Sequence, residues 1–202
     1  MAVITISRQF GAGGRTLGTG VAQRLNYLFE DDAVIQEIAR KAKVSKSSVK
    51  GHEQTAGSLI SRFLSTIVDR GYMERLTGGK GYIDEDVYVE TLTDVITEFA
   101  ERDNVVLLGR ASQYILHDSE NAFHILMVAA ETDRIDFIQK NYNLSPEKAR
   151  QAVEQGDKRR HNLYSKFAKS GYDTPTLYHM CLNMSRVSIE QAVELVCKMV
   201  TG

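Results

Sequence analysis

The sequence predicts an α/β protein in which a parallel five-stranded sheet lies between layers of helices. Short apolar runs rich in β-branched residues alternate along the chain with longer segments of helical periodicity. Continuous apolar runs of this kind are typical of strands buried on both faces of a sheet. A chain of 202 residues can be organised around one core. We therefore expect a single domain over residues 1–202.

Five short runs supply the predicted strands. The first is a β-branched run that ends on a polar and glycine-rich cluster, and the third ends on a glycine. The others are bounded by polar or turn-forming residues, as strands of a parallel sheet usually are. The expected strands cover residues 2–6, 27–29, 104–109, 123–128 and 180–184.

The helices are predicted from apolar spacing and from capping residues. Residues 15–26 and 84–102 carry apolar side chains at helical spacing, and the stretch 33–71 reads as an interrupted helical region. Ser145 followed by Pro146 is a strong helix start. Ser188, with Gln191 three positions later, matches the capping-box pattern and predicts the start of the final helix.

Composition excludes several classes of protein. The chain has 25 basic and 26 acidic residues, so no overall field attracts nucleic acid or an anionic membrane, and we expect neither as a partner. No signal-peptide pattern or membrane-length apolar run is present, which predicts a cytoplasmic protein. Cys181 and Cys197 lie on apolar segments and are interpreted as core residues. The histidines show no metal-ligand spacing, and the sequence leaves open whether the chain forms a homo-oligomer.

The turn between the first strand and the first helix carries the strongest functional signal. Three glycines and an Arg-Thr pair occupy a position where backbone N–H groups and the helix dipole favour an anion. Glycine permits the backbone angles and close approach that a phosphate-wrapping turn requires. A merely tight connection would not need so many glycines. The predicted phosphate-binding residues are Gly11, Ala12, Gly13, Gly14, Arg15 and Thr16.

The turn does not satisfy the strict pattern G-x-x-x-x-G-K-[ST], and two registers are open. In one, Gly14-Arg15-Thr16 replaces Gly-Lys-Thr, with Arg15 as the cation and Thr16 as the hydroxyl that holds magnesium. In the other, an ungapped match to the turn Gly-Ala-Gly-Lys-Gly-Thr places Gly14 at the lysine. In both registers Arg15 is interpreted as the cation of the turn.

The segment from Ile4 to Gly18, ITISRQFGAGGRTLG, closely resembles the opening of the cytidylate kinase-like family. The resemblance continues through the whole chain. Asp31 ends a segment that is similar to the second strand of that family, and Leu108-Gly109-Arg110 resembles its acceptor-phosphate motif. Asp157 and Arg160 resemble the Asp-x-x-Arg of its lid helix, and residues 183–190 resemble its last strand and closing helix.

This resemblance implies a P-loop kinase-type fold with a helical acceptor-side region at about residues 33–100 and a lid at about 145–175. It implies ATP and Mg²⁺ as cofactors, with Thr16 holding the metal. Arg15, Arg110 and Arg160 would stabilise the moving phosphoryl group. Asp31, Arg110, Asp157 and Arg160 would bind the substrates, with Asp157 meeting the ribose, although Asp31 also suits a helix cap.

The sequence also departs from true cytidylate kinases. The P-loop lysine is absent, Ala111 replaces an aspartate that reads cytosine, and Glu37 and Val153 each replace an arginine. The leading hypothesis is an ATP-dependent phosphotransferase that acts on a small acceptor such as a nucleoside monophosphate. The alternative is a non-catalytic nucleotide-binding sensor, and a third class is a scaffold that keeps only the fold.

Overall fold

The computed structural model describes residues 2–31, 34, 36–37, 85–168 and 172–202. Within them lies a five-stranded sheet in the order β2-β3-β1-β4-β5, in which every neighbouring pair is parallel. This confirms the predicted sheet, and each strand begins and ends within two residues of its expected position. The strands are β1 (Val3–Arg8), β2 (Leu28–Glu30), β3 (Val105–Leu108), β4 (Ala122–Val128) and β5 (Met180–Asn183).

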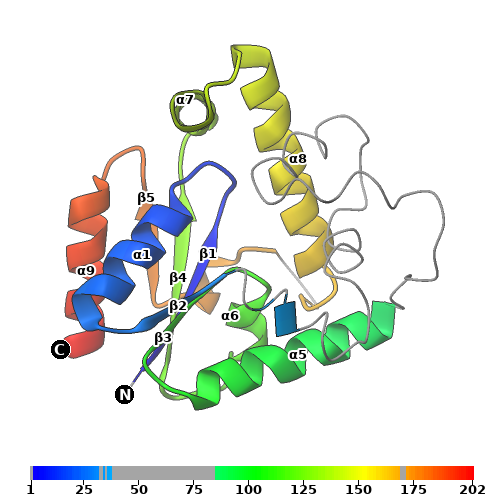
Figure 1. The fold of residues 1–202 in the computed structure, drawn as a ribbon, viewed down its shortest axis with the longest axis vertical. Coiled ribbons are helices and arrows are strands. Elements are labelled where there is room, and N and C mark those ends of the chain that lie inside the picture. The colour runs from blue at the N-terminus through cyan, green and yellow to red at the C-terminus, as the bar shows by residue number, and fades with distance from the viewer. Residues whose placement is uncertain (1, 32–33, 35, 38–84, 169–171) are drawn as a thin grey trace.

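The described helices cover both faces of this sheet, as Figure 1 shows. Helices α1 and α9 pack on one face, and α5 and α6 pack on the other. Helices α7 and α8 follow β4 and stand near the carboxyl ends of the strands. Their bounds are α1 (Gly14–Leu25), α5 (Glu85–Glu101), α6 (Ser112–Ile115), α7 (Glu131–Tyr142), α8 (Pro146–Tyr164) and α9 (Ile189–Thr201).

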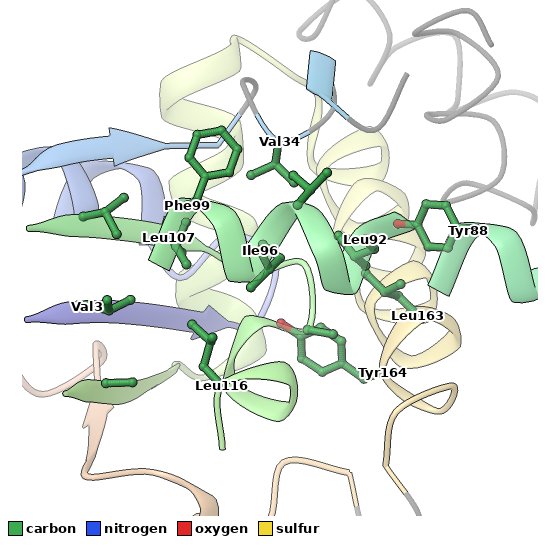
Figure 2. Close-up of a cluster of buried hydrophobic side chains, with 14 residues drawn as sticks. Val3, Val34, Tyr88, Leu92, Ile96, Phe99, Leu107, Leu116, Leu163 and Tyr164 are labelled. Atoms are coloured by element: carbon green, nitrogen blue, oxygen red, sulfur yellow. The ribbon is translucent and has the colours of Figure 1, made fainter. Parts of the chain in front are cut away.

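Two hydrophobic clusters, one on each face of the sheet, hold the helices of the two faces against the strands. Alternate side chains of β1 point to opposite faces, because successive residues of a strand alternate in direction. Val3 packs with Leu92 and Ile96 of α5 in the cluster that Figure 2 shows, whereas Ile4 packs with Leu17 of α1 on the opposite face. The α5 cluster also reaches Leu163 and Tyr164 of α8 (Figure 2), and it thereby joins α8 to the sheet.

The predicted helix starts at the chain's two serine caps are confirmed. The Ser145 hydroxyl accepts a hydrogen bond from the N–H of Lys148 at the start of α8. The Ser188 hydroxyl accepts from the N–H of Gln191, whose side chain accepts from the Ser188 N–H in return, completing a capping box. Both signals are local, so they could be recognised without knowledge of the tertiary structure.

The interpretation of both cysteines as core residues is half wrong. Cys197 on α9 is buried, but Cys181 is exposed, because it lies on β5 at the edge of the sheet. Most of the predicted helical region at 33–71, including the Glu37 neighbourhood beyond residue 37, lies outside the described residues. Among the helices that are described, none combines the length and the apolar character needed to span a bilayer.

A buried polar pair joins the central strand β1 to its neighbour β4. Thr5 of β1 lies opposite His124 of β4, and the Thr5 hydroxyl lies 2.8 Å from Nδ1 of His124. Burial lowers the pKa of His124 from 6.5 to about 4, with smaller contributions in the same direction from His179 and His117. The imidazole is therefore neutral in the folded protein at neutral pH.

This lowered pKa predicts a loss of stability in mild acid. The unfolded chain binds a proton at His124 below about pH 6.5, whereas the folded chain resists binding one until about pH 4, so stability falls as the pH drops through that window. Between pH 7 and pH 5 the expected loss is about 2 kcal/mol. Urea unfolding of the wild type and of His124→Gln at both pH values measures it. An equal loss in both proteins would show that other groups cause it.

Candidate functional site

A cavity of about 910 Å³ opens at the carboxyl ends of β1 and β3. Its lining comes from the turn after β1, from the first turns of α1, and from residues of α7 and α8. Open α/β sheets bind ligands at this edge, because the loops that follow the strands meet there. The volume lies within the range of small-molecule and cofactor sites.

The turn between β1 and α1 forms one wall of this cavity. Gly11 and Gly13 adopt left-handed backbone angles, with φ of 87° and 84°. At Gly11 a Cβ would lie 2.9 Å from the carbonyl oxygen of Arg134, so the close approach of α7 also requires glycine. Gly13 is the N-cap of α1 and makes no side-chain hydrogen bond to the start of the helix. The helix start is therefore not capped by its own N-cap residue, which suits an anion.

The cavity concentrates positive charge in a chain that has a net charge of −1. Among its lining residues in the described part of the chain, five are arginines and one is acidic. A local cluster of this kind attracts an anion although the protein as a whole does not. The charged lining residues are Arg8, Arg15, Asp31, Arg110, Arg159 and Arg160.

Three of the predicted site residues meet in one ionic cluster. Nη2 of Arg15 donates to Oδ2 of Asp31 at 2.5 Å, and Nη2 of Arg110 lies 3.9 Å from Oδ1. The side chain of Arg15 is 61% exposed, whereas that of Asp31 is 10% exposed. Asp31, which directly follows β2, thus joins Arg15 at the start of α1 to Arg110, the second residue after β3. Arg110 itself has a left-handed φ of 57°.

Arg160, one of the predicted site residues, reaches the cavity from α8 and is held on several sides. Its Nη2 donates to Ser7 Oγ at 2.9 Å and to Asp173 Oδ1 at 2.5 Å, and its Nη1 donates to the Tyr172 hydroxyl. The guanidinium also lies over the ring of Tyr164, 4.8 Å from its centroid. This network joins α8 to Tyr172 and Asp173 through one cation.

Thr16 lies in the first turn of α1, is exposed and lines the cavity, so its hydroxyl is available to a metal ion that accompanies a phosphate. In the described ranges no group of three or more His, Cys, Asp or Glu side chains forms a metal-binding cluster. A magnesium ion here would therefore depend on Thr16, water and phosphate oxygens, as is usual for this metal.

Two predicted residues do not line the cavity. Ala12 is buried against the hydrophobic cluster of α1 and α9. Asp157 of α8 accepts from the Phe10 N–H at 2.9 Å through Oδ1 and from Nη1 of Arg134 at 2.6 Å through Oδ2. Both of its oxygens are thus engaged in holding the turn, and the ribose contact inferred for it stays a prediction.

Two positions that differ from true cytidylate kinases also turn away from the cavity. Ala111 is buried in the α5 cluster, and Val153 is buried in a small cluster between α7 and α8. Neither contributes to the described lining. The side chains at these positions therefore fill hydrophobic clusters and add nothing to the described lining of the cavity.

Sequence reasoning missed several lining residues, of which Arg8 is the most informative. Arg8 is the last residue of β1, and its side chain lies in the cavity beside Arg110 and Arg160. Its position at the carboxyl end of a buried strand was a usable signal. Phe10 and Tyr164 also line the cavity, but nothing in their spacing distinguished them from packing residues.

The comparisons with known proteins agree with this architecture. The model of the cytidylate kinase-like family matches residues 3–186. No protein of curated function matches the sequence significantly. Among solved structures, an uncharacterized protein from Eubacterium ventriosum is 16% identical, with a TM-score of 0.69 over 99% of this chain and 98% of the other.

Two solved kinases share the same fold. Shikimate kinase from Bacteroides thetaiotaomicron is 14% identical, with a TM-score of 0.55 over 100% of this chain and 99% of its own. A sugar kinase from Janibacter sp. is 10% identical, with a TM-score of 0.56 over 100% and 95%. At these identities the likeness shows the fold alone, and it confirms the predicted P-loop kinase-type architecture.

Proposed function

Because the chain belongs to the cytidylate kinase-like family, we propose that it transfers the γ-phosphoryl group of ATP to a small acceptor such as a nucleoside monophosphate. The observation that carries this proposal is the cavity itself. Five arginines and the start of α1, whose N-cap is Gly13, face a space of about 910 Å³ at the carboxyl edge of the sheet. That arrangement suits a polyphosphate much better than an apolar or cationic ligand.

The proposed reaction needs little covalent help from the protein. An acceptor oxygen attacks the γ-phosphorus, the bond from this phosphorus to the bridging oxygen breaks, and ADP leaves with the electron pair of that bond. Arg15, Arg110 and Arg160 would spread charge stabilisation over the transferring group. A magnesium ion next to Thr16 would neutralise the β- and γ-phosphates when bound.

Arg110 is assigned to the acceptor phosphate, because Leu108-Gly109-Arg110 resembles the acceptor-phosphate motif of the family and Arg110 lines the cavity. Arg110→Met is expected to raise the KM of the acceptor about tenfold or more, because a charge-assisted hydrogen bond to phosphate is lost, while the affinity for ATP changes little. ADP release from magnesium-ATP is followed with a panel of nucleoside monophosphates and hydroxylated acceptors.

Arg150→Met is the matched control for this experiment, because Arg150 is exposed on α8 and lies outside the cavity lining. The wild type and this control should turn over the same acceptor at the same rate. No ADP above background with any acceptor would count against an enzyme, and an equal loss in both arginine variants would contradict the assignment of Arg110.

A non-catalytic nucleotide sensor is the second candidate. Arg15 already pairs with Asp31, and Asp157 already holds Phe10 and Arg134, so residues expected at the substrates are engaged within the protein. Under this reading nucleotide binding would set the position of the segment that follows α8. Calorimetry separates the two, since tight ATP binding without turnover supports the sensor and no binding excludes both.

A further inference from the structure

The phosphate turn lacks the P-loop lysine, but an arginine side chain occupies the space over the position where that lysine would stand. In the ungapped register the lysine position falls on Gly14, and the first glycine of the pattern falls on Arg8. A Cβ at Gly14 would lie 2.8 Å from Cγ and 3.2 Å from Cδ of Arg8. The Arg8 side chain therefore passes directly over the backbone of Gly14 and leaves no room for a side chain there.

A second glycine receives the far end of the same side chain. A Cβ at Gly109, which follows β3, would lie 2.0 Å from Nη1 and 3.2 Å from Cζ of Arg8. Gly109 also has a left-handed φ of 72°. Because β1 and β3 are neighbours in the sheet, the guanidinium extends from the end of one strand to the end of the other. It remains within the lining of the cavity.

Two neighbouring arginines, Arg15 and Arg160, each pair with a carboxylate, whereas Arg8 pairs with none in the part of the chain that the structure describes. Arg15 pairs with Asp31 and Arg160 pairs with Asp173, each at 2.5 Å. Within the described residues the Arg8 guanidinium makes no hydrogen bond or ion pair. Burial lowers the pKa of Arg8, Tyr164 and Asp31 act against this change, and the guanidinium groups of Arg110 and Arg160 add to it. An anion in the cavity would relieve this unfavourable arrangement.

We infer that Arg8 is the phosphate-binding cation of this site and that it replaces the missing P-loop lysine. This inference rests on the proposed function, because it assigns a residue to the nucleotide of that same cavity. Compared with the P-loop pattern, the cation stands at position 8 in place of the first glycine, and a glycine stands at position 14 in place of the lysine. The cation would therefore reach the β- and γ-phosphates from the end of β1. The planar guanidinium can donate two parallel hydrogen bonds to phosphate oxygens, which a lysine cannot do.

The first experiment measures the affinity for magnesium-ATP by calorimetry and the melting temperature without nucleotide. Arg8→Met is expected to weaken ATP binding about 30-fold, as the loss of a charge-assisted contact does. The ligand-free melting temperature should stay the same or rise, because two like-charged neighbours lose a third. Arg8→Lys should keep part of the affinity, and the exposed Arg150→Met serves as the charge-matched control.

The second experiment restores the ordinary pattern of the turn. Gly14→Lys alone is expected to bind ATP poorly, because its Cβ meets Arg8. The double variant Arg8→Gly with Gly14→Lys removes that contact and supplies the lysine, so its affinity should return to within about threefold of the wild type. Arg8→Gly alone should remain as weak as Arg8→Met.

The outcomes distinguish this inference from the proposed function. If the wild type binds ATP and Arg8→Met binds it equally well, the assignment of Arg8 is wrong and the proposed function stands. A lowered ligand-free melting temperature with unchanged affinity would likewise make Arg8 a structural residue. If the wild type binds no nucleotide, the proposed function fails and the inference fails with it.

Discussion

Asp157→Ala is expected to lower the free energy of unfolding by about 3 kcal/mol, although alanine favours the helix more than aspartate does. The physical reason is the charge left behind. The side chain of Arg134 is 8% exposed, and its Nη1 donates to Asp157 at 2.6 Å and to the Phe10 carbonyl at 3.1 Å. Without the carboxylate, the buried guanidinium of Arg134 loses its charged partner and the Phe10 N–H loses its acceptor. Urea unfolding with linear extrapolation measures the change.

Two variants separate the charge from the hydrogen bond. Asp157→Asn keeps an oxygen for the Phe10 N–H but removes the negative charge, so we expect a smaller loss of about 1 kcal/mol. Arg134→Met removes the buried cation, and in that background Asp157→Ala should cost much less than in the wild type. A cost that is the same in both backgrounds would refute the importance of this pair. An Asp157→Ala protein with the same free energy of unfolding as the wild type would also refute it.

Gly156→Ala should destabilise the protein by about 2 kcal/mol, which is opposite in sign to the usual effect of this substitution in a helix. A Cβ at Gly156 on α8 would lie 2.2 Å from Cγ and 2.6 Å from Cβ of Phe10. Rotation of the Phe10 side chain cannot clear the contact with its Cβ. Since Asp157 holds the Phe10 backbone, α8 and the phosphate turn would have to move apart.

The matched background for this prediction is Phe10→Gly, which removes the three atoms that the new Cβ would approach most closely. In that background Gly156→Ala should raise the free energy of unfolding by up to about 1 kcal/mol, the ordinary helix-propensity gain. The change of sign between the two backgrounds amounts to a coupling of about 3 kcal/mol. Thermal and urea unfolding measure all four proteins. The same sign in both would show that the contact does not limit stability.

Local signals accounted for most of the fold. The β-branched run of β1, the glycines of the turn and the caps at Ser145 and Ser188 each act within a few residues, so their consequences could be predicted from the chain alone. Strand positions followed from the length of the apolar runs and from their bounding residues. The exposure of Cys181 could not be predicted in this way, because a four-residue run has the same pattern at the edge of a sheet as at its centre.

The candidate site was predictable only in part. The sequence pointed to Arg15, Asp31, Arg110 and Arg160, and the structure places all four around one cavity. It did not reveal that Arg15 turns outward to Asp31, since that pairing joins α1 to the end of β2 through the tertiary fold. Nor did it reveal that Asp157 is engaged with the turn and with α7, because its partners lie 147 and 23 residues away.

The amino-acid order alone determined the strand, turn and helix that form the helix start for which we propose anion binding, because the backbone angles of a glycine turn and the free N–H groups of a helix start are local properties. Only the tertiary structure indicated that the Arg8 side chain lies against Gly14 at the start of this helix, which is the basis for assigning Arg8 to the phosphates. The route of the Arg8 side chain over Gly14 and toward Gly109 exists because β1 and β3 lie side by side. Long side chains are directed by the packing around them, and that packing depends on residues about 100 positions apart in this chain.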